Sequence, residues 1–392
     1  NSSTRGNTSA VYMNNNNASI SFPKSTESGS TKFEVRISNL RSKEETITVA
    51  ATDFFAEYNE KNSTSYKMLP ASEYTLFEEG NVSNSSNNGI LKVTIKPGQT
   101  SAQIGVKVRP LDEDAYPMGV KYAIPLRIVS ASLPILSNKD VVVTLSRPFK
   151  TSVAKIAQGY ALGVKVADNV PESDEFTVQG LFLFKEFHAY NGVNVNMSLF
   201  QGEMLPYTRI DAGKIQVKNG GGDSPDDWAE TADIAKDKWV QITFTYKDSF
   251  LKLYINGKLI KTYQRPSLKV SPGMRINIEN TQTSYSANRY FREFRVWNRV
   301  LTEAEIVDGL YLPVDPTSKG LVVYLPINKK DGFKDMSNYD NTVIYRKGTS
   351  SFNSGIQDGP SYVKDIDEAT FTPTVQWKDN VKFPAVGLET EE

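Results

Sequence analysis

The chain of 392 residues contains no cysteine and a single histidine, His188. The absence of cysteine excludes a disulfide framework and thiolate catalysis, and one histidine cannot build a zinc site that needs several. Its 45 basic residues balance 45 acidic ones, so nothing in the net charge favours nucleic acid or an anionic membrane surface as a partner. No run reaches the roughly 18 apolar residues of a membrane-spanning helix. A globular protein of two or three domains is the expectation that remains.

The residues that are abundant indicate β structure. Tyr and Phe each occur 19 times, and long amphipathic helical patterns are scarce. Segment 238–260 shows this best. Ile242, Phe244 and Tyr246 alternate with polar residues before a turn at 247–249, and the alternation resumes after it over 251–255. The pair Asn256-Gly257 then favours the positive φ angles of a type I′ hairpin turn. Three consecutive antiparallel strands are therefore predicted.

The first 150 residues contain seven short alternating segments separated by turn-rich stretches. They lie at 18–22, 31–37, 45–51, 91–95, 101–108, 122–129 and 141–145. This pattern is typical of an immunoglobulin-like sandwich. Segments 57–60, 66–74, 95–99 and 122–126 resemble the N-terminal domain of unknown function of Bacteroidetes-type surface lipoproteins, some of them endoglycosidases. The resemblance implies an accessory domain at the cell surface, associated with glycan capture.

The second half has a different signature. Trp239, segment 253–257 and segment 294–306 (FRVWNRVLTEAEI) resemble the bacterial form of the laminin-G or concanavalin-like jelly roll. Thr302 and Glu305 have the spacing of a capping box, which predicts a short helix after the strand. Further strands are expected at 160–166, 176–184, 197–201, 207–211, 214–218, 275–279 and 290–297. Folds of this kind support adhesion, sugar binding and hydrolysis alike, so the fold does not decide the function.

An all-β protein of four parts is therefore predicted. Residues 1–17 are polar and low in complexity and are expected to form a flexible tether. The immunoglobulin-like domain covers 18–147, a linker lies at 147–150, the jelly roll covers 153–311, and 312–392 form a C-terminal appendage packed on it. The polar start at 1–17 is similar to that of a mature secreted lipoprotein. It predicts export, an N-terminal lipid anchor, and a place at the cell surface or outer membrane, or in the periplasm. We expect a monomer.

Catalytic signatures are weak. Concanavalin-class glucanases use a Glu-x-Asp-x-x-Glu strand, which places two carboxylates on one face. The nearest match begins at Glu172 and Asp174, but Thr177 occupies the third position. His188 has no Gly-x-Ser-x-Gly partner motif for a hydrolase triad. No catalytic residue is predicted, although a glycoside hydrolase with a non-standard carboxylate pair stays open.

The acidic loop 220–230 is the candidate metal site. It combines three glycines with Asp223, Asp226 and Asp227, which could supply oxygen ligands to calcium, and with Trp228, whose flat ring could stack on a sugar. The resemblance favours calcium, because many laminin-G-like domains hold the ion near their ligand rim. Against it, the spacing does not follow an EF-hand, and Trp228 could instead pack back onto the sandwich.

Other candidate ligand contacts share side chains that suit sugar hydroxyls or sugar faces. They are Tyr190, Asn191, Tyr207, Arg209, Asn280, Gln282 and Tyr285. Each of them alone could also be an ordinary turn or rim residue. The sequence predicts a non-catalytic, lectin-like surface protein with a glycan ligand; the alternatives are the hydrolase above and a structural or protein-binding module.

Overall fold

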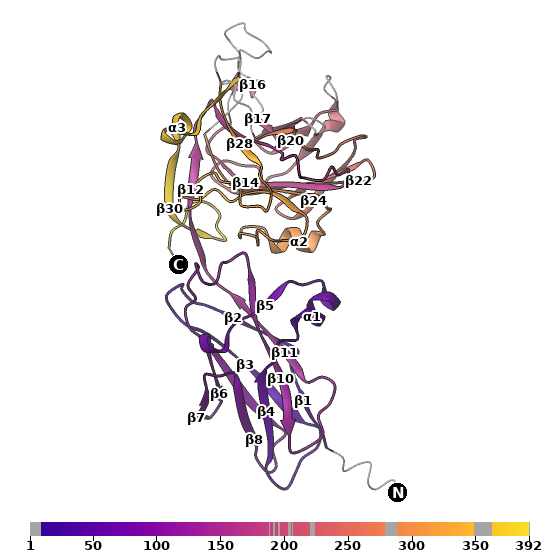
Figure 1. Cartoon of the computed structure of the whole chain (residues 1–392), viewed down its shortest axis with the longest axis vertical. Coiled ribbons are helices and arrows are strands. Elements are labelled where there is room, and N and C mark those ends of the chain that lie inside the picture. The colour runs from indigo at the N-terminus through magenta and orange to yellow at the C-terminus, as the bar shows by residue number, and fades with distance from the viewer. Residues whose placement is uncertain are drawn as a thin grey trace. The chain divides into compact units, whose positions relative to one another are not determined.

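The computed structural model describes residues 9–187, 189–190, 193–194, 197–202, 205, 207–219, 224–278, 288–348 and 363–391 (Figure 1). The chain divides into two compact units, Asn1–Phe149 and Lys150–Glu391. The boundary falls inside the expected linker. Strands dominate both units, which confirms the all-β prediction. Within the described residues, no helix is long and apolar enough to cross a membrane.

Unit 1 is a sandwich of two sheets. The first has the order β1 (Val11–Met13), β3 (Gly29–Ile37), β9 (Ser101–Val108), β6 (Tyr74–Glu78) and β7 (Asn81–Ser86). The second has the order β2 (Asn17–Ser21), β11 (Asp140–Ser146), β10 (Lys121–Ala131), β4 (Glu45–Ala51) and β8 (Ile90–Ile95), with β5 (Tyr66–Met68) beside β10. Alternate apolar residues such as Val35, Ile47 and Ile104 are fully buried between the sheets. All seven predicted strands are present, together with α1 (Phe55–Asn62) and η1 (Ala71–Glu73).

The start of unit 1 differs from the flexible tether expected over 1–17. Strand β1 pairs with β3 and buries Val11 completely and Met13 to 3% exposure. Asn17 already begins β2, which pairs with β11. Three residues are too few to show an alternating pattern, and the polar run that follows conceals them. The pairing supplied by β3 makes this short segment a strand.

Unit 2 is a larger sandwich. Its large sheet has the order β24 (Lys258–Gln264), β23 (Phe250–Ile255), β22 (Trp239–Lys247), β14 (Phe176–Phe184), β26 (Arg289–Trp297), β12 (Phe149–Ile156) and β30 (Gln376–Phe383), with β27 (Leu321–Leu325) beside β26. The opposing sheet has the order β18 (Gln201–Gly202), β25 (Arg275–Ile278), β13 (Tyr160–Lys165), β28 (Thr342–Gly348) and β29 (Val363–Ile366). Phe182, Phe244 and Phe291 belong to the buried core of this unit. The two-sheet prediction is confirmed.

Two smaller groups of strands complete unit 2. A small sheet has the order β17 (Met197–Leu199), β19 (Thr208–Asp211), β20 (Lys214–Val217) and β21 (Trp228–Glu230). A hairpin pairs β15 (Ala189–Tyr190) with β16 (Val193–Asn194). The short helices are η2 (Pro225–Asp227), α2 (Glu303–Asp308), α3 (Glu368–Phe371) and η4 (Thr372–Thr374).

The predicted three-stranded segment is confirmed as β22, β23 and β24. Asp248 and Ser249 turn between the first two strands with φ of 53° and 69°, and Asn256 and Gly257 turn between the last two with φ of 50° and 78°. Both turns therefore use the left-handed backbone of type I′. The polar residues of β22 do not face solvent, however, because Thr243 and Thr245 are 0% and 2% exposed.

Residues 298–320 cover the outer face of the large sheet. Thr302 is the N-cap of helix α2, and Thr302 and Glu305 form the predicted capping box. Its Ile306 packs in one cluster with Tyr254 of β23 and Trp297 of β26. This cover explains why β22 and β14 are buried on both faces although the sheet is antiparallel.

The C-terminal residues 312–392 contribute strands to both sheets, where an appendage packed on the jelly roll was expected. β27 pairs with β26, β28 pairs with β13, and β30 lies beyond β12 at the edge of the large sheet. The run LVVYL of β27 is apolar throughout, as suits a strand buried on both faces. Its partner lies almost thirty residues away in the sequence, so local patterning alone could not assign it to the sheet.

Substituting Gly257 tests the hairpin. A Cβ at Gly257 would lie 2.7 Å from Val307 Cγ2, whereas a Cβ at Gly273, which has the same left-handed φ, meets nothing within 4 Å. Gly273→Ala should cost about 1–2 kcal/mol, the ordinary price of a left-handed alanine. Gly257→Ala should cost about 1 kcal/mol more because of the added overpacking. Denaturant unfolding measures both, and equal losses would contradict the contact with α2.

Candidate functional site

The outward face of the small sheet brings together two of the predicted ligand contacts. Strand register places Arg209 of β19 opposite Gln216 of β20, and Gln216 opposite Trp228 of β21. Residues directly opposite in antiparallel strands point to the same face. The alternate residues Ile210 and Ile215 belong to the buried core, so this row points away from it.

A second row lies beside the first on the same face. Asp211 stands opposite Lys214, and Lys214 stands opposite Glu230. Lys214 Nζ lies 4.7 Å from the centroid of the Trp228 ring. We call the two rows, Arg209, Gln216, Trp228, Asp211, Lys214 and Glu230, the platform. Its members that are not buried offer the Trp228 ring with the guanidinium group of Arg209 and the carboxylate of Glu230 around it, which suits a polar ligand with one flat apolar face.

The burial of the platform is graded. Gln216 and Asp211 are 1% and 2% exposed, whereas Glu230 is exposed and Trp228 and Lys214 are half-buried. Asp211 Oδ1 accepts a hydrogen bond of 2.7 Å from the Ala212 amide, which directs the carboxylate toward the turn into β20. Tyr207, another predicted contact, lies next to the platform, with its ring centroid 6.0 Å from the Arg209 guanidinium.

Neighbouring side chains fix the main chain that carries Trp228. Lys261 Nζ of β24 donates to the carbonyl oxygens of Asp226 at 2.6 Å and Trp228 at 2.9 Å. Tyr263 Oη donates to the Asp227 carbonyl at 3.0 Å, and burial raises the pKa of this tyrosine. The edge of the large sheet thus holds η2 and the start of β21.

Two parts of the chain match models of known protein families. Residues 159–307 match the model of the concanavalin A-like lectin/glucanases superfamily, and residues 5–135 match a model described as an N-terminal domain. Unit 2 contains a concanavalin A-like domain. This confirms the jelly-roll resemblance, and the N-terminal match confirms the resemblance to a known N-terminal domain.

Two solved structures illustrate the likeness. A Bacteroides ovatus protein described as "a putative carbohydrate binding protein" is 21% identical, with a TM-score of 0.56, covering 91% of this chain and 98% of its own. A SAP-like pentraxin of Limulus polyphemus is 13% identical, with a TM-score of 0.33, covering 53% and 98%. No curated protein sequence matches the chain significantly. At this identity the first likeness supports the fold.

The predicted calcium ligands of the concanavalin A-like domain are only partly described. Asp227 is buried; its Oδ2 accepts from the Ser224 amide at 3.2 Å, and its Oδ1 lies 3.3 Å from Arg265 Nη2. Asp226 is exposed, and Asp223 lies outside the described residues. Among the residues that are described, no three His, Cys, Asp or Glu side chains are placed to hold a metal ion. The Asp227 carboxylate caps η2 and pairs with Arg265, so of the three predicted ligands this one already has protein partners.

The remaining predicted contacts stay predictions. Tyr190 ends β15 and pairs with Val193 in the hairpin, but its side chain is not among those described. Asn191, Asn280, Gln282 and Tyr285 lie outside the described residues, as does His188.

Sequence reasoning missed Gln216 and Lys214, although it placed both on a predicted strand. The signal was available in the alternation of Lys214 and Gln216 with Ile215 and Val217, which are core residues. The tight turn at Ala212 and Gly213 sets the register with β19, and so places Gln216 beside Arg209.

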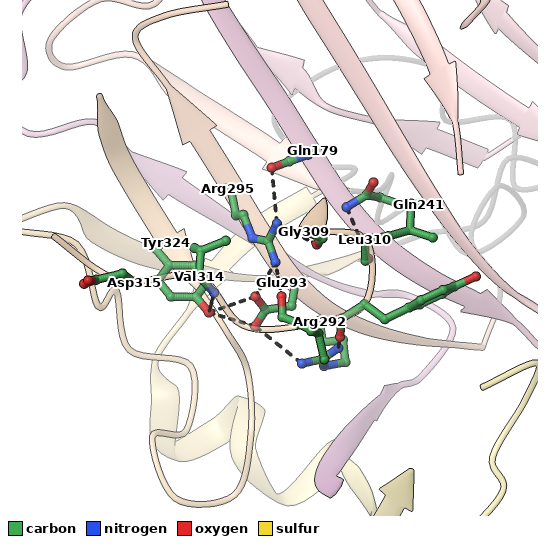
Figure 2. Close-up of polar contacts among 12 residues, drawn as sticks. Gln179, Gln241, Arg292, Glu293, Arg295, Gly309, Leu310, Val314, Asp315 and Tyr324 are labelled. Atoms are coloured by element: carbon green, nitrogen blue, oxygen red, sulfur yellow. Dashed lines mark hydrogen bonds and ion pairs between the residues drawn. The ribbon is translucent and has the colours of Figure 1, made fainter. Parts of the chain in front are cut away.

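A second cluster of charged side chains lies on the outer face of the large sheet (Figure 2). Glu293 accepts from Arg295 Nη2 at 2.6 Å and from Tyr324 Oη at 2.8 Å, and lies 3.6 Å from Arg292 Nη2. These four side chains are at most 2% exposed. Burial lowers the pKa of Arg292, and burial with the neighbouring Glu293 carboxylate raises the pKa of Tyr324 well above its usual range. We call these four residues the buried charge cluster.

The buried charge cluster binds main-chain carbonyl groups of the covering segment. Arg295 donates to the oxygens of Gly309 at 3.2 Å and Leu312 at 2.6 Å, and Arg292 donates to that of Tyr311 at 2.6 Å. Gln241 donates to Leu310 at 3.3 Å, so four consecutive carbonyl groups are held (Figure 2). The cluster therefore fixes 309–312 on the sheet, and its burial leaves it no access to a ligand.

Glu293→Gln tests this structural role. The change keeps the shape of the side chain but leaves two buried guanidinium groups without a counter-charge, which should cost about 3–5 kcal/mol. Glu175→Gln is the matched control, because Glu175 forms an ion pair with Lys247 whose side chains are 47% and 57% exposed. That control should lose at most about 1 kcal/mol. Equal midpoints of chemical unfolding for the two variants would contradict the assignment.

Proposed function

We propose that the concanavalin A-like domain binds glycans on the platform and does not cleave them. The observation that carries the proposal is the platform, on which the strand register brings Trp228 together with Arg209 and Glu230, which are not buried, while the buried Gln216 lies between Arg209 and Trp228. The superfamily match and the description of the Bacteroides ovatus structure support carbohydrate binding in general terms.

Recognition would combine ring stacking with hydrogen bonding. The apolar face of a sugar ring would stack on Trp228, contributing on the order of 1 kcal/mol. The guanidinium group of Arg209 and the carboxylate of Glu230 beside the ring would pair with hydroxyl groups as donor and acceptor. Three adjacent strands lie about 4.8 Å apart, so the row spans one or two sugar units. A single site of this size would bind weakly.

Thr177 stands where the glucanase motif would place its third carboxylate, and its surroundings argue against hydrolysis. Thr177 is fully buried. Its Oγ1 donates to the Arg299 carbonyl at 2.8 Å and accepts from the Leu301 amide at 3.0 Å. A carboxylate at this place would lie under the covering segment, away from any substrate.

The setting of this activity belongs to the same proposal. We propose an exported monomer, attached at the cell surface or outer membrane by an N-terminal lipid, or held in the periplasm, with unit 1 as an accessory domain. Support comes from the resemblance of the N-terminal segments to surface lipoproteins and from the family match over 5–135. Calcium at the ligand rim remains part of the proposal, with Asp223 and Asp226 as its candidate ligands.

Trp228→Ala on a glycan array tests the proposal. Loss of one stacked ring should weaken binding about fivefold or more, given roughly 1 kcal/mol for the ring. Phe250→Ala is the control, because Phe250 is a 49% exposed aromatic residue on β23. Thermal unfolding of each variant verifies the fold, and a parallel array with a chelator reports on calcium.

Three outcomes contradict the proposal. Full binding by Trp228→Ala would move the site away from the platform. Silence of the folded wild-type protein across neutral and charged glycans would leave a structural or protein-binding module as the better account, and release of reducing sugar from a bound glycan would favour the hydrolase.

A further inference from the structure

Lys214 occupies part of the surface on which a sugar would stack. Its Nζ lies 4.7 Å from the centroid of the Trp228 ring, a cation–π distance. Both residues are half-buried and lie on the outward face of the small sheet. An indole face in contact with an ammonium group cannot stack on a sugar at the same time.

The same lysine has a second partner within reach. Glu230 stands directly opposite Lys214 in the register of β20 and β21, two residues beyond Trp228. Opposite residues of an antiparallel pair have Cβ atoms about 5 Å apart, so the ammonium group can reach the carboxylate by changing rotamer. Glu230 is exposed, which leaves room for this position. Asp211 stands on the other side of Lys214, but it is 2% exposed and already accepts a hydrogen bond from the Ala212 amide. It is therefore less accessible to the ammonium group than Glu230 is.

We propose that Lys214 is a latch on the platform. In the closed position its ammonium group covers Trp228; in the open position it pairs with Glu230 and the ring stacks on a sugar. Lys214 thereby sets the affinity for neutral glycans. This inference rests on the proposed glycan binding. Breaking an exposed cation–π contact before stacking should reduce affinity about two- to fivefold.

A graded series of variants tests the latch. Lys214→Ala should bind the neutral oligosaccharide with the strongest array signal about two- to fivefold more tightly than wild type. Lys214→Arg should bind it more weakly, because a guanidinium stacks on indole better than an ammonium group does. Glu230→Gln should also weaken binding, since the open position loses its charged partner. Isothermal titration calorimetry measures all three, after thermal unfolding has verified each fold.

A measurement without glycan completes the test. Trp239 and Trp297 are 1% and 4% exposed, so a Trp377→Phe background leaves Trp228 as the principal tryptophan open to acrylamide. Adding Lys214→Ala should raise the acrylamide quenching constant, because the ring loses its cover. An unchanged quenching constant would overturn the latch.

The latch and the glycan site fail in different ways. If Trp228→Ala abolishes binding but Lys214→Ala binds equally or more weakly, the glycan site stands and the latch is overturned. Equal binding would mean that the ammonium group does not compete with the sugar, and weaker binding would mean that it contacts the sugar. If Trp228→Ala binds as wild type does, the proposed function itself falls, and the latch with it.

Discussion

The carboxylate of Glu293 is the interaction on which the architecture of unit 2 depends. It accepts from Arg295 and Tyr324 and pairs with Arg292, and through the two arginines it holds the carbonyl groups of 309–312. Ion pairs buried in this way are seldom more stabilising than apolar packing of the same volume. Their geometric demands are stricter, however, so the hydrogen bonds from the two arginines to carbonyl groups require one position of the covering segment. Specifying that position is the role that the contacts support.

A local distortion of β26 makes this arrangement possible. In a regular strand, residues three apart point to opposite faces. Phe291 and Phe294 nevertheless both lie in the core, and Arg292 and Arg295 both lie on the outer face. Glu293 has a left-handed backbone with φ of 55°, and the pairing with β14 shifts register at this point, as in a β-bulge. One extra residue thus turns two arginines to the covering segment without removing either phenylalanine from the core.

The two faces of unit 2 show why alternation alone does not report exposure. On β22 the polar residues Thr243 and Thr245 are buried under the covering segment 298–320, which comes from distant sequence. On β20 the same alternation separates core residues from the platform, but Gln216 of the platform is itself 1% exposed. Alternation therefore identifies the face to which a residue points, and it does not identify whether that face is covered. Strand positions, the Asn256-Gly257 turn and the α2 capping box depend on neighbouring residues and were predictable. The sheet membership of β27, β28 and β30 and the pairing of Gln216 with Trp228 depend on partners that local patterns do not name.

The acidic loop before Trp228 shows how one residue type can serve two kinds of chemistry. Oxygen-rich loops with glycine suit calcium, and for this reason the sequence predicts Asp226 and Asp227 as calcium ligands. The order Ser224-Pro225-Asp226-Asp227 is also a capping pattern, with serine at the N-cap, proline at N1 and an acidic residue at N3. Ser224 and Asp227 form a capping box, as Thr302 and Glu305 do at α2. Because a carboxylate that accepts from an N-cap amide and pairs with Arg265 has little capacity left for a metal, the capping pattern accounts for Asp227 better than metal binding does. By capping η2, Asp227 helps to place Trp228 on the platform.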